Sequence, residues 1–77
     1  MELKDYKHIH FIGIGGIGVS AIAEIVKSRG VEASGSDMKA SEVTDNLQKQ
    51  GIKVYIGHDA KNIEGADLVV YSTAVSL

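Results

Sequence analysis

The fold is decided by one glycine-rich stretch, HIHFIGIGGIG, which runs from His8 to Gly18. Its opening residues are typical of a short buried strand, and an apolar-periodic segment follows the glycines. The glycines at 13, 15 and 18 have the G-x-G-x-x-G spacing that joins a strand to a helix in nucleotide-binding folds. There the first glycine allows a tight turn, the second lets a phosphate approach, and the third allows close helix packing. The start of the helix would then offer unpaired N–H groups to an anion.

The remaining chain continues the alternation of strands and helices. The expected elements are a strand at 8–12, a helix at 16–28, a strand at 31–36, a helix at 42–50, and strands at 52–56 and 68–71. Gly30 and Gly51 are expected to end the two helices, and Ser41 to cap the second. The segment 58–66 has room for at most one helical turn. We expect the first helix to bury one apolar face, made of Ile17, Ala21, Ile22, Ile25 and Val26.

This order of elements predicts an α/β fold of the Rossmann-like, three-layer class. Right-handed crossovers would arrange the four strands as a parallel sheet in the order 3-2-1-4. Ligands of such sheets lie beyond the carboxyl ends of the strands, where the strand order reverses. Four strand exits would converge at that edge, and they carry the residues 13–18, Ser36-Asp37, Gly57-His58 and 72–74.

Composition narrows the range of functions. The chain has 77 residues, which fits one small domain, and a formal net charge of −2, which argues against general nucleic-acid binding. It contains no cysteine and no apolar run long enough to cross a membrane. No P-loop, catalytic triad or paired carboxylates are evident, and His8 and His10 alone do not make a metal site. We therefore expect a cytoplasmic nucleotide-binding domain without a membrane or nucleic-acid partner.

The residues themselves leave the nucleotide open. Asp37 lies about 20 residues after the glycines, where dinucleotide folds place an acid that binds ribose hydroxyls. A small NAD(H)-binding domain is therefore one alternative, and a Rossmann-like interaction module without a ligand is another. NAD domains usually run an apolar strand into that acid, whereas here Ala-Ser-Gly-Ser precedes it. This difference argues against NAD(H) but does not identify another nucleotide.

From His10 to Ser20, and again at Gly35-Ser36-Asp37, Gly57-His58 and 70–75, the sequence resembles the Mur ligases of peptidoglycan synthesis. The resemblance implies that residues 1–77 form the N-terminal UDP-binding domain of a three-domain enzyme. It further implies an enzyme that activates the muramyl carboxylate of UDP-N-acetylmuramate as an acyl phosphate, which the amine of L-alanine then attacks. ATP and magnesium bind in the central domain. We expect the central and C-terminal domains to be absent here, and the chain alone to be inactive, with no catalytic residue and no metal ligand.

The resemblance also implies a UDP-sugar site, formed by Gly15, Gly16, Ile17, Gly18, Ser36, Asp37, His58, Ser72, Thr73 and Ala74. The glycine-loop members would donate backbone N–H groups to the diphosphate. The two residues after the second strand would face the uridine, and those after the fourth strand would border the diphosphate or the sugar. A related family member that attaches a tripeptide would share this site, but residues 16–20 fit the alanine-adding member better.

Overall fold

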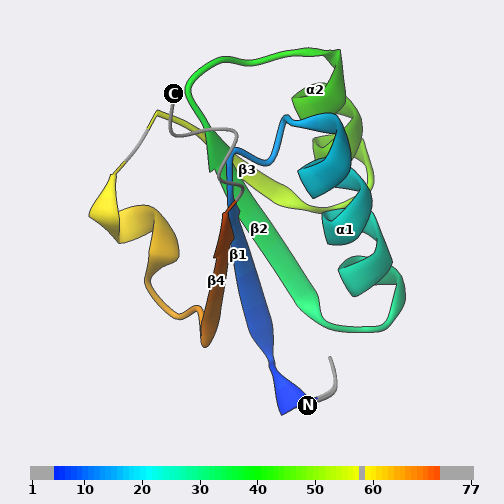
Figure 1. Ribbon diagram of the computed structural model, residues 1–77, viewed down its shortest axis with the longest axis vertical. Helices are drawn as coiled ribbons and strands as arrows, with labels where there is room; N and C mark the ends of the chain where they lie inside the picture. The colour runs from blue at the N-terminus through cyan, green and yellow to red at the C-terminus, as the bar shows by residue number, and fades with distance from the viewer. Residues whose placement is uncertain (1–4, 58, 72–77) are drawn as a thin grey trace.

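The computed structural model describes residues 5–57 and 59–71, and Figure 1 shows their arrangement around one sheet. The elements are β1 (His8–Ile12), α1 (Ile17–Ser28), β2 (Glu32–Asp37), α2 (Glu42–Lys49), β3 (Lys53–Ile56), the 3-10 helix η2 (Ala60–Ile63) and β4 (Leu68–Tyr71). All neighbouring strands are parallel, and their order is β3-β2-β1-β4. The expected α/β class and the strand order 3-2-1-4 are therefore confirmed.

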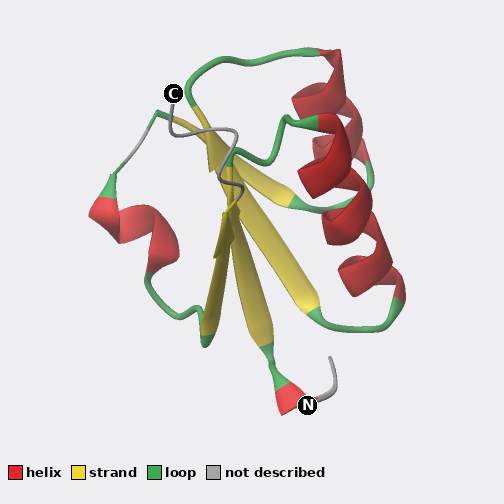
Figure 2. Cartoon of the chain, in the orientation of Figure 1, coloured by secondary structure: helices red, strands yellow, loops and turns green. Residues whose placement is uncertain are grey.

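The helices form unequal layers on the two faces of the sheet. Figure 2 shows α1 and α2 on one side and the short η2 on the other. The expectation of at most one helical turn between residues 58 and 66 is confirmed, because η2 has only four residues. The apolar run of β4, which is typical of a strand covered on both faces, is only half-buried at Leu68, Val69 and Val70. The reason is that β4 lies at one end of the described sheet, with β1 as its one partner.

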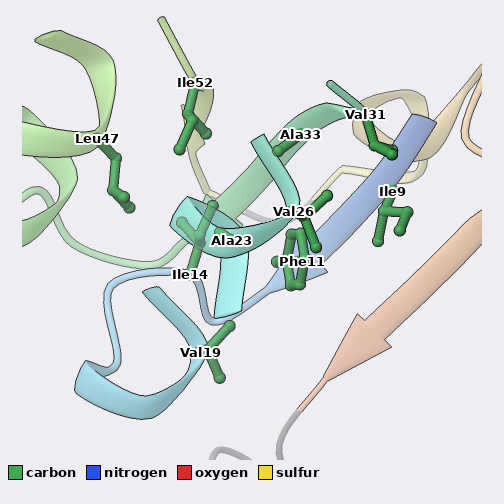
Figure 3. Packing of buried hydrophobic residues seen from close by; sticks show 10 residues of the cluster. All are labelled: Ile9, Phe11, Ile14, Val19, Ala23, Val26, Val31, Ala33, Leu47 and Ile52. Carbon is green, nitrogen blue, oxygen red and sulfur yellow. The ribbon is translucent and has the colours of Figure 1, made fainter. Parts of the chain in front are cut away.

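The core lies between the sheet and the two long helices, as Figure 3 shows in close view. Ile9 and Phe11 of β1 are buried there with residues from α1, α2 and β2. Phe11 has no exposed surface. The other members of the cluster are Ile14, Val19, Ala23, Val26, Val31, Ala33, Leu47 and Ile52. Burying a large aliphatic or aromatic side chain contributes roughly 1.5–3 kcal/mol to stability. The cluster therefore stabilises the packing of the helices on the sheet, and it includes Ile14 of the glycine loop.

The expected buried face of α1 is correct only for Val26. The helix buries Val26 together with Val19, Ser20 and Ala23. Ile17 is 85% exposed, and Ile22 and Ile25 are about half exposed. The hydroxyl of the buried Ser20 donates a hydrogen bond to the Ile17 carbonyl at 3.0 Å. The reason is tertiary: the docking of the glycine loop on β2 sets the rotation of α1, so small side chains meet the sheet.

The helix ends agree with their sequence signals. Gly30 and Gly51 follow α1 and α2 with φ of 85° and 89°, the left-handed conformation that ends helices. Ser41 caps α2: its Oγ accepts from the Thr44 N–H at 3.3 Å. In return the Thr44 Oγ1 accepts from the Ser41 N–H at 2.8 Å. Both expected helix stops and the expected cap are confirmed.

Candidate functional site

The glycine loop is docked onto the end of β2 by its backbone. Gly13 takes a φ of 77°, which turns the chain out of β1. The N–H groups of Gly13 and Ile14 then both donate to the Ser36 carbonyl, at 2.8 and 3.0 Å. Because one carbonyl accepts both bonds, the position of the loop depends on the end of β2.

A side chain of the loop completes this docking. Ile14 is fully buried and packs over Gly35 in β2. A Cβ atom placed on Gly35 would come within 2.6 Å of the Ile14 Cβ, closer than real Cβ contacts. Our reading of the sequence missed this requirement for glycine. The available signal was an isolated glycine inside a strand, which often marks a close approach of another part of the chain.

Asp37 holds the next residue of the loop. Its Oδ2 accepts a hydrogen bond from the Gly15 N–H at 2.8 Å, and its Oδ1 accepts one from the Lys39 N–H at 3.3 Å. A Cβ on Gly15 would lie 2.7 Å from the same Oδ2, so the contact requires glycine. The residue expected to face the uridine and the residue expected to bind the diphosphate thus bind each other.

The first turn of α1 presents the N–H groups of Ile17, Gly18 and Val19. They have no carbonyl partner within the helix, because α-helical bonds begin with the fourth residue after the N-cap, here Ser20 to Gly16 at 2.8 Å. No side chain of the described residues caps this end, and its first turn carries no acidic residue. The positive end of the helix dipole is therefore available to an anion.

Gly18 does not have the expected packing role. A Cβ built on Gly18 meets no atom within 4 Å among the described residues, so the expectation of close packing there is wrong. The reason is the rotation of α1 described above, which directs this position away from the sheet. Gly18 itself belongs to the first turn of α1, so a side chain added there would extend from this turn into space that no described residue fills.

The structure brings six of the ten expected site residues together. Gly15, Gly16, Ile17 and Gly18 lie in or next to the loop, and Ser36 and Asp37 hold it. Ser36 is buried, and its Oγ is 3.4 Å from the Nε2 of His10. The other four residues, His58, Ser72, Thr73 and Ala74, lie outside the described residues.

The two histidines of β1 share a polar cluster on the side of the sheet away from α1 and α2. Ser34 Oγ lies 2.7 Å from His8 Nε2 and 2.8 Å from His10 Nδ1. Burial lowers the pKa of His10 below its ordinary value, and the nearby His8 lowers it further. In residues 5–57 and 59–71, no three His, Cys, Asp or Glu side chains are arranged to hold a metal ion.

Asp67 joins the starts of β1 and β4. Its two carboxylate oxygens accept from the N–H groups of Lys7 and His8, each at 2.8 Å. These backbone bonds hold the pKa of Asp67 below its ordinary value. Our reading of the sequence did not single out this residue, since an aspartate before a strand has many possible partners. These two hydrogen bonds of Asp67 lie at the amino ends of β1 and β4, at the opposite edge of the sheet from the glycine loop.

A hollow elsewhere on the surface is formed by a single helix. A shallow hollow on α2 is lined by Glu42, Asp45, Asn46 and Lys49, all from the same helix. Within the described part of the chain, no helix is both long and apolar enough to span a bilayer. The glycine loop at the carboxyl edge of the sheet is therefore the place where the geometry favours a ligand.

Comparison with known proteins supports one family. The model of the Mur ligase family, catalytic domain, matches residues 8–77. A UDP-N-acetylmuramate–L-alanine ligase of Acetivibrio thermocellus is 56% identical over 75 residues, which are 97% of this chain and 16% of the relative. An enzyme of the same name from Burkholderia lata is 61% identical over 69 residues, 90% of this chain and 15% of the relative.

Solved structures agree. A UDP-N-acetylmuramate-alanine ligase from Thermotoga maritima matches with a TM-score of 0.84 and 43% identity, over 90% of this chain and 16% of its own. A murein peptide ligase from Psychrobacter arcticus matches with a TM-score of 0.80 and 27% identity, over 84% of this chain and 14% of its own. This chain thus spans about a sixth of the length of these relatives. The extent of the family match, the identities and the shared fold together show that the chain belongs to the Mur ligase family.

Proposed function

We propose that this chain binds the UDP moiety of UDP-N-acetylmuramate, with the diphosphate at the start of α1. The observation that carries the proposal is that the N–H groups of Ile17, Gly18 and Val19 have no partner among the described residues, none of which lies within 4 Å of a Cβ at Gly18. This end of α1 follows β1, which lies between β2 and β4 at the point where the strand order reverses. Ligands of open α/β sheets bind at such a point.

Asp37 is proposed to serve both the loop and the nucleoside. A carboxylate has about four lone-pair sites, and the bonds from Gly15 and Lys39 use two of them. The remaining sites can accept hydrogen bonds from the uridine. The Gly15 N–H, already bound to Asp37, is then a weaker candidate for the diphosphate than the N–H groups of Ile17 and Gly18.

We place the rest of the ligase reaction outside this chain. The names of the relatives support a parent enzyme that joins L-alanine to UDP-N-acetylmuramate. ATP and magnesium are proposed to bind in the part of the relatives' length that this chain does not span, and the parent is proposed to act in the cytoplasm. His58, Ser72, Thr73 and Ala74 remain proposed ligand contacts at the ends of β3 and β4. This chain would bind the UDP part of the substrate.

The alternative of an NAD(H)-binding domain has less support. Its main argument was the carboxylate of Asp37, which a dinucleotide domain would direct at the adenosine ribose. The bond from Gly15 leaves the same lone pairs of Asp37 for either nucleoside, so this carboxylate does not favour NAD(H) over a uridine nucleotide. Three of the four relatives named above are UDP-N-acetylmuramate–alanine ligases, the fourth is a murein peptide ligase, and none of the four is named as a nicotinamide enzyme.

Calorimetric titration of the chain with UDP, UDP-N-acetylmuramate and NADH tests the proposal. We expect both uridine nucleotides to bind more tightly than NADH. Gly18→Val should lower the affinity for UDP about tenfold or more, because the new side chain occupies the space beside the free N–H groups while meeting no protein atom within 4 Å at its Cβ. Thermal unfolding should show that the variant remains folded.

Ala21→Val is the matched control. Ala21 is exposed on the same helix about one turn further on, so the change adds a valine to α1 away from its first turn. We expect its affinity for UDP to stay within about twofold of the original. Tighter binding of NADH than of UDP would overturn the proposed ligand. Equal UDP affinity in Gly18→Val and Ala21→Val would overturn the proposed diphosphate site.

A further inference from the structure

A chain of four polar side chains crosses from β1 to β2 on the sheet face that lacks the long helices. In order, it runs His8, Ser34, His10, Ser36, with separations of 2.7, 2.8 and 3.4 Å. His10 has no exposed surface, and Ser34 and Ser36 are 2% and 3% exposed. Buried polar groups cost free energy unless they are hydrogen-bonded, so each of these groups depends on its neighbours.

The chain of side chains ends directly beneath the glycine loop. In the register of the sheet, His10 pairs with Ser34 and Ile12 pairs with Ser36. His10 therefore reaches diagonally from one strand to two residues of the next. Its upper partner, Ser36, is the residue whose carbonyl holds the N–H groups of Gly13 and Ile14. The imidazole thus links the strand that leads into the loop to the residue that anchors it.

The chemistry of imidazole suits this linking role. In a neutral ring one nitrogen donates and the other accepts, and burial lowers the pKa of His10, which favours the neutral form. The Ser34 hydroxyl has one proton, so it donates to one histidine and accepts from the other. The direction of the bond from His10 to Ser36 then follows from the direction at Ser34. Hydrogen bonds in such a chain polarise and support one another.

We propose that His10 is a positioning residue for the nucleotide-binding loop, acting through its ring contacts with Ser34 and Ser36. It touches no ligand in this role. It fixes the end of β2 against β1, so that the Ser36 carbonyl stands where Gly13 and Ile14 can both donate to it. The effect on UDP affinity rests on the function proposed above, whereas the effect on the loop itself does not.

The test compares four variants by amide hydrogen exchange and by UDP titration. His10→Leu removes both hydrogen bonds of the ring, along with its aromatic contact with Tyr55, and Ser36→Ala removes only the bond to Ser36 and keeps the carbonyl. His10→Gln restores one donor and one acceptor. His8→Leu is the matched control, because it removes the other partner of Ser34, far from the loop. The reference amide is Ile52, which donates to Leu47 at the end of α2.

In His10→Leu and Ser36→Ala we expect the exchange protection of the Gly13 and Ile14 amides to fall at least about tenfold relative to Ile52. His10→Gln should recover most of it, and His8→Leu should leave the ratio within about twofold. UDP affinity should fall about three- to tenfold in the first two variants. A purely structural role would lower the protection of Ile52 together with that of the loop.

The outcomes separate the two proposals. An unchanged ratio of loop to reference protection in both His10→Leu and Ser36→Ala would overturn the positioning role, even if the chain binds UDP. If His10→Leu fails to fold, Ser36→Ala alone decides, since it removes one hydroxyl. A loop-specific loss of protection in a chain that prefers NADH to UDP would support the positioning role and overturn the proposed ligand.

Discussion

Gly35→Ala is the substitution whose effect the structure defines most sharply. Gly35 lies inside β2 beneath the loop residue Ile14, whose side chain is fully buried. A Cβ there would lie 2.6 Å from the Ile14 Cβ and 2.8 Å from its Cγ1, and would also meet its Cδ1. These atoms are close to the backbone, so the loop itself must shift.

The expected magnitude follows from two opposing effects. Overpacking a well-packed core costs about 1–3 kcal/mol. The φ of Gly35 is not positive, so alanine fits the backbone at this strand position. Its smaller loss of conformational entropy on folding should stabilise the chain by about 0.5–1 kcal/mol relative to glycine. The approach of 2.6 Å between two Cβ atoms places the overpacking cost in the upper part of its range, about 2–3 kcal/mol, so the net loss is about 1–2.5 kcal/mol. A domain of this size has a free energy of unfolding of about 4–12 kcal/mol, and each kcal/mol shifts its Tm by about 4–8 °C.

Urea denaturation followed by circular dichroism measures this loss, with Gly18→Ala as the matched control. Gly18 lies in α1 with nothing within 4 Å of an added Cβ, so the same change should stabilise the chain by about 0.5–1 kcal/mol. Ile14→Val removes the Cδ1 atom and should reduce the cost of Gly35→Ala by at least about 0.5 kcal/mol. A cost of zero for Gly35→Ala, or strict additivity with Ile14→Val, would refute the argument.

Three further predictions concern stability. Ser41→Ala should lower the free energy of unfolding by about 1 kcal/mol, because α2 loses its N-cap. Ser41→Asp should keep most of the stability, because aspartate also caps helices. The midpoints of urea denaturation compare the two variants. Because the pKa of His10 is lowered on folding, the unfolded chain takes up that proton first, so stability should fall as pH drops below about 6.5. In His10→Gln, the Tm should depend less on pH in this range. An equal slope in the variant and the original protein would contradict the role of His10 in this pH dependence. Folding also lowers the pKa of Asp67, so its contribution to stability should be present above about pH 3.8 and disappear as the pH falls through the pKa of the folded state. Asp67→Asn should therefore be less stable than the original at neutral pH, and its Tm should no longer show this acid dependence.

The sequence was sufficient for the order of elements and their ends. Period-two and period-3.6 patterns are local, and so are the signals of Ser41, Gly30 and Gly51, which act through their own backbone. Right-handed crossovers then leave few arrangements for four such strands. The family resemblance rests on the same glycine loop and on the residues that follow the later strands. These are short stretches of sequence, so the resemblance can be recognised from the sequence alone.

The contacts of the glycine loop were decided by the tertiary structure. Its spacing indicates a phosphate-binding turn, but the spacing says nothing about Ile14 over Gly35 or about Asp37 bound to Gly15. These contacts join residues about 20 positions apart, and their geometry depends on how β1 and β2 align. The buried face of α1 was mispredicted for the same reason, since several apolar stripes fit its sequence and only the docked loop selects one. Local backbone preferences determined where each element lies along the chain, whereas packing between strands and the loop decided which side chains face inward and which N–H groups remain free.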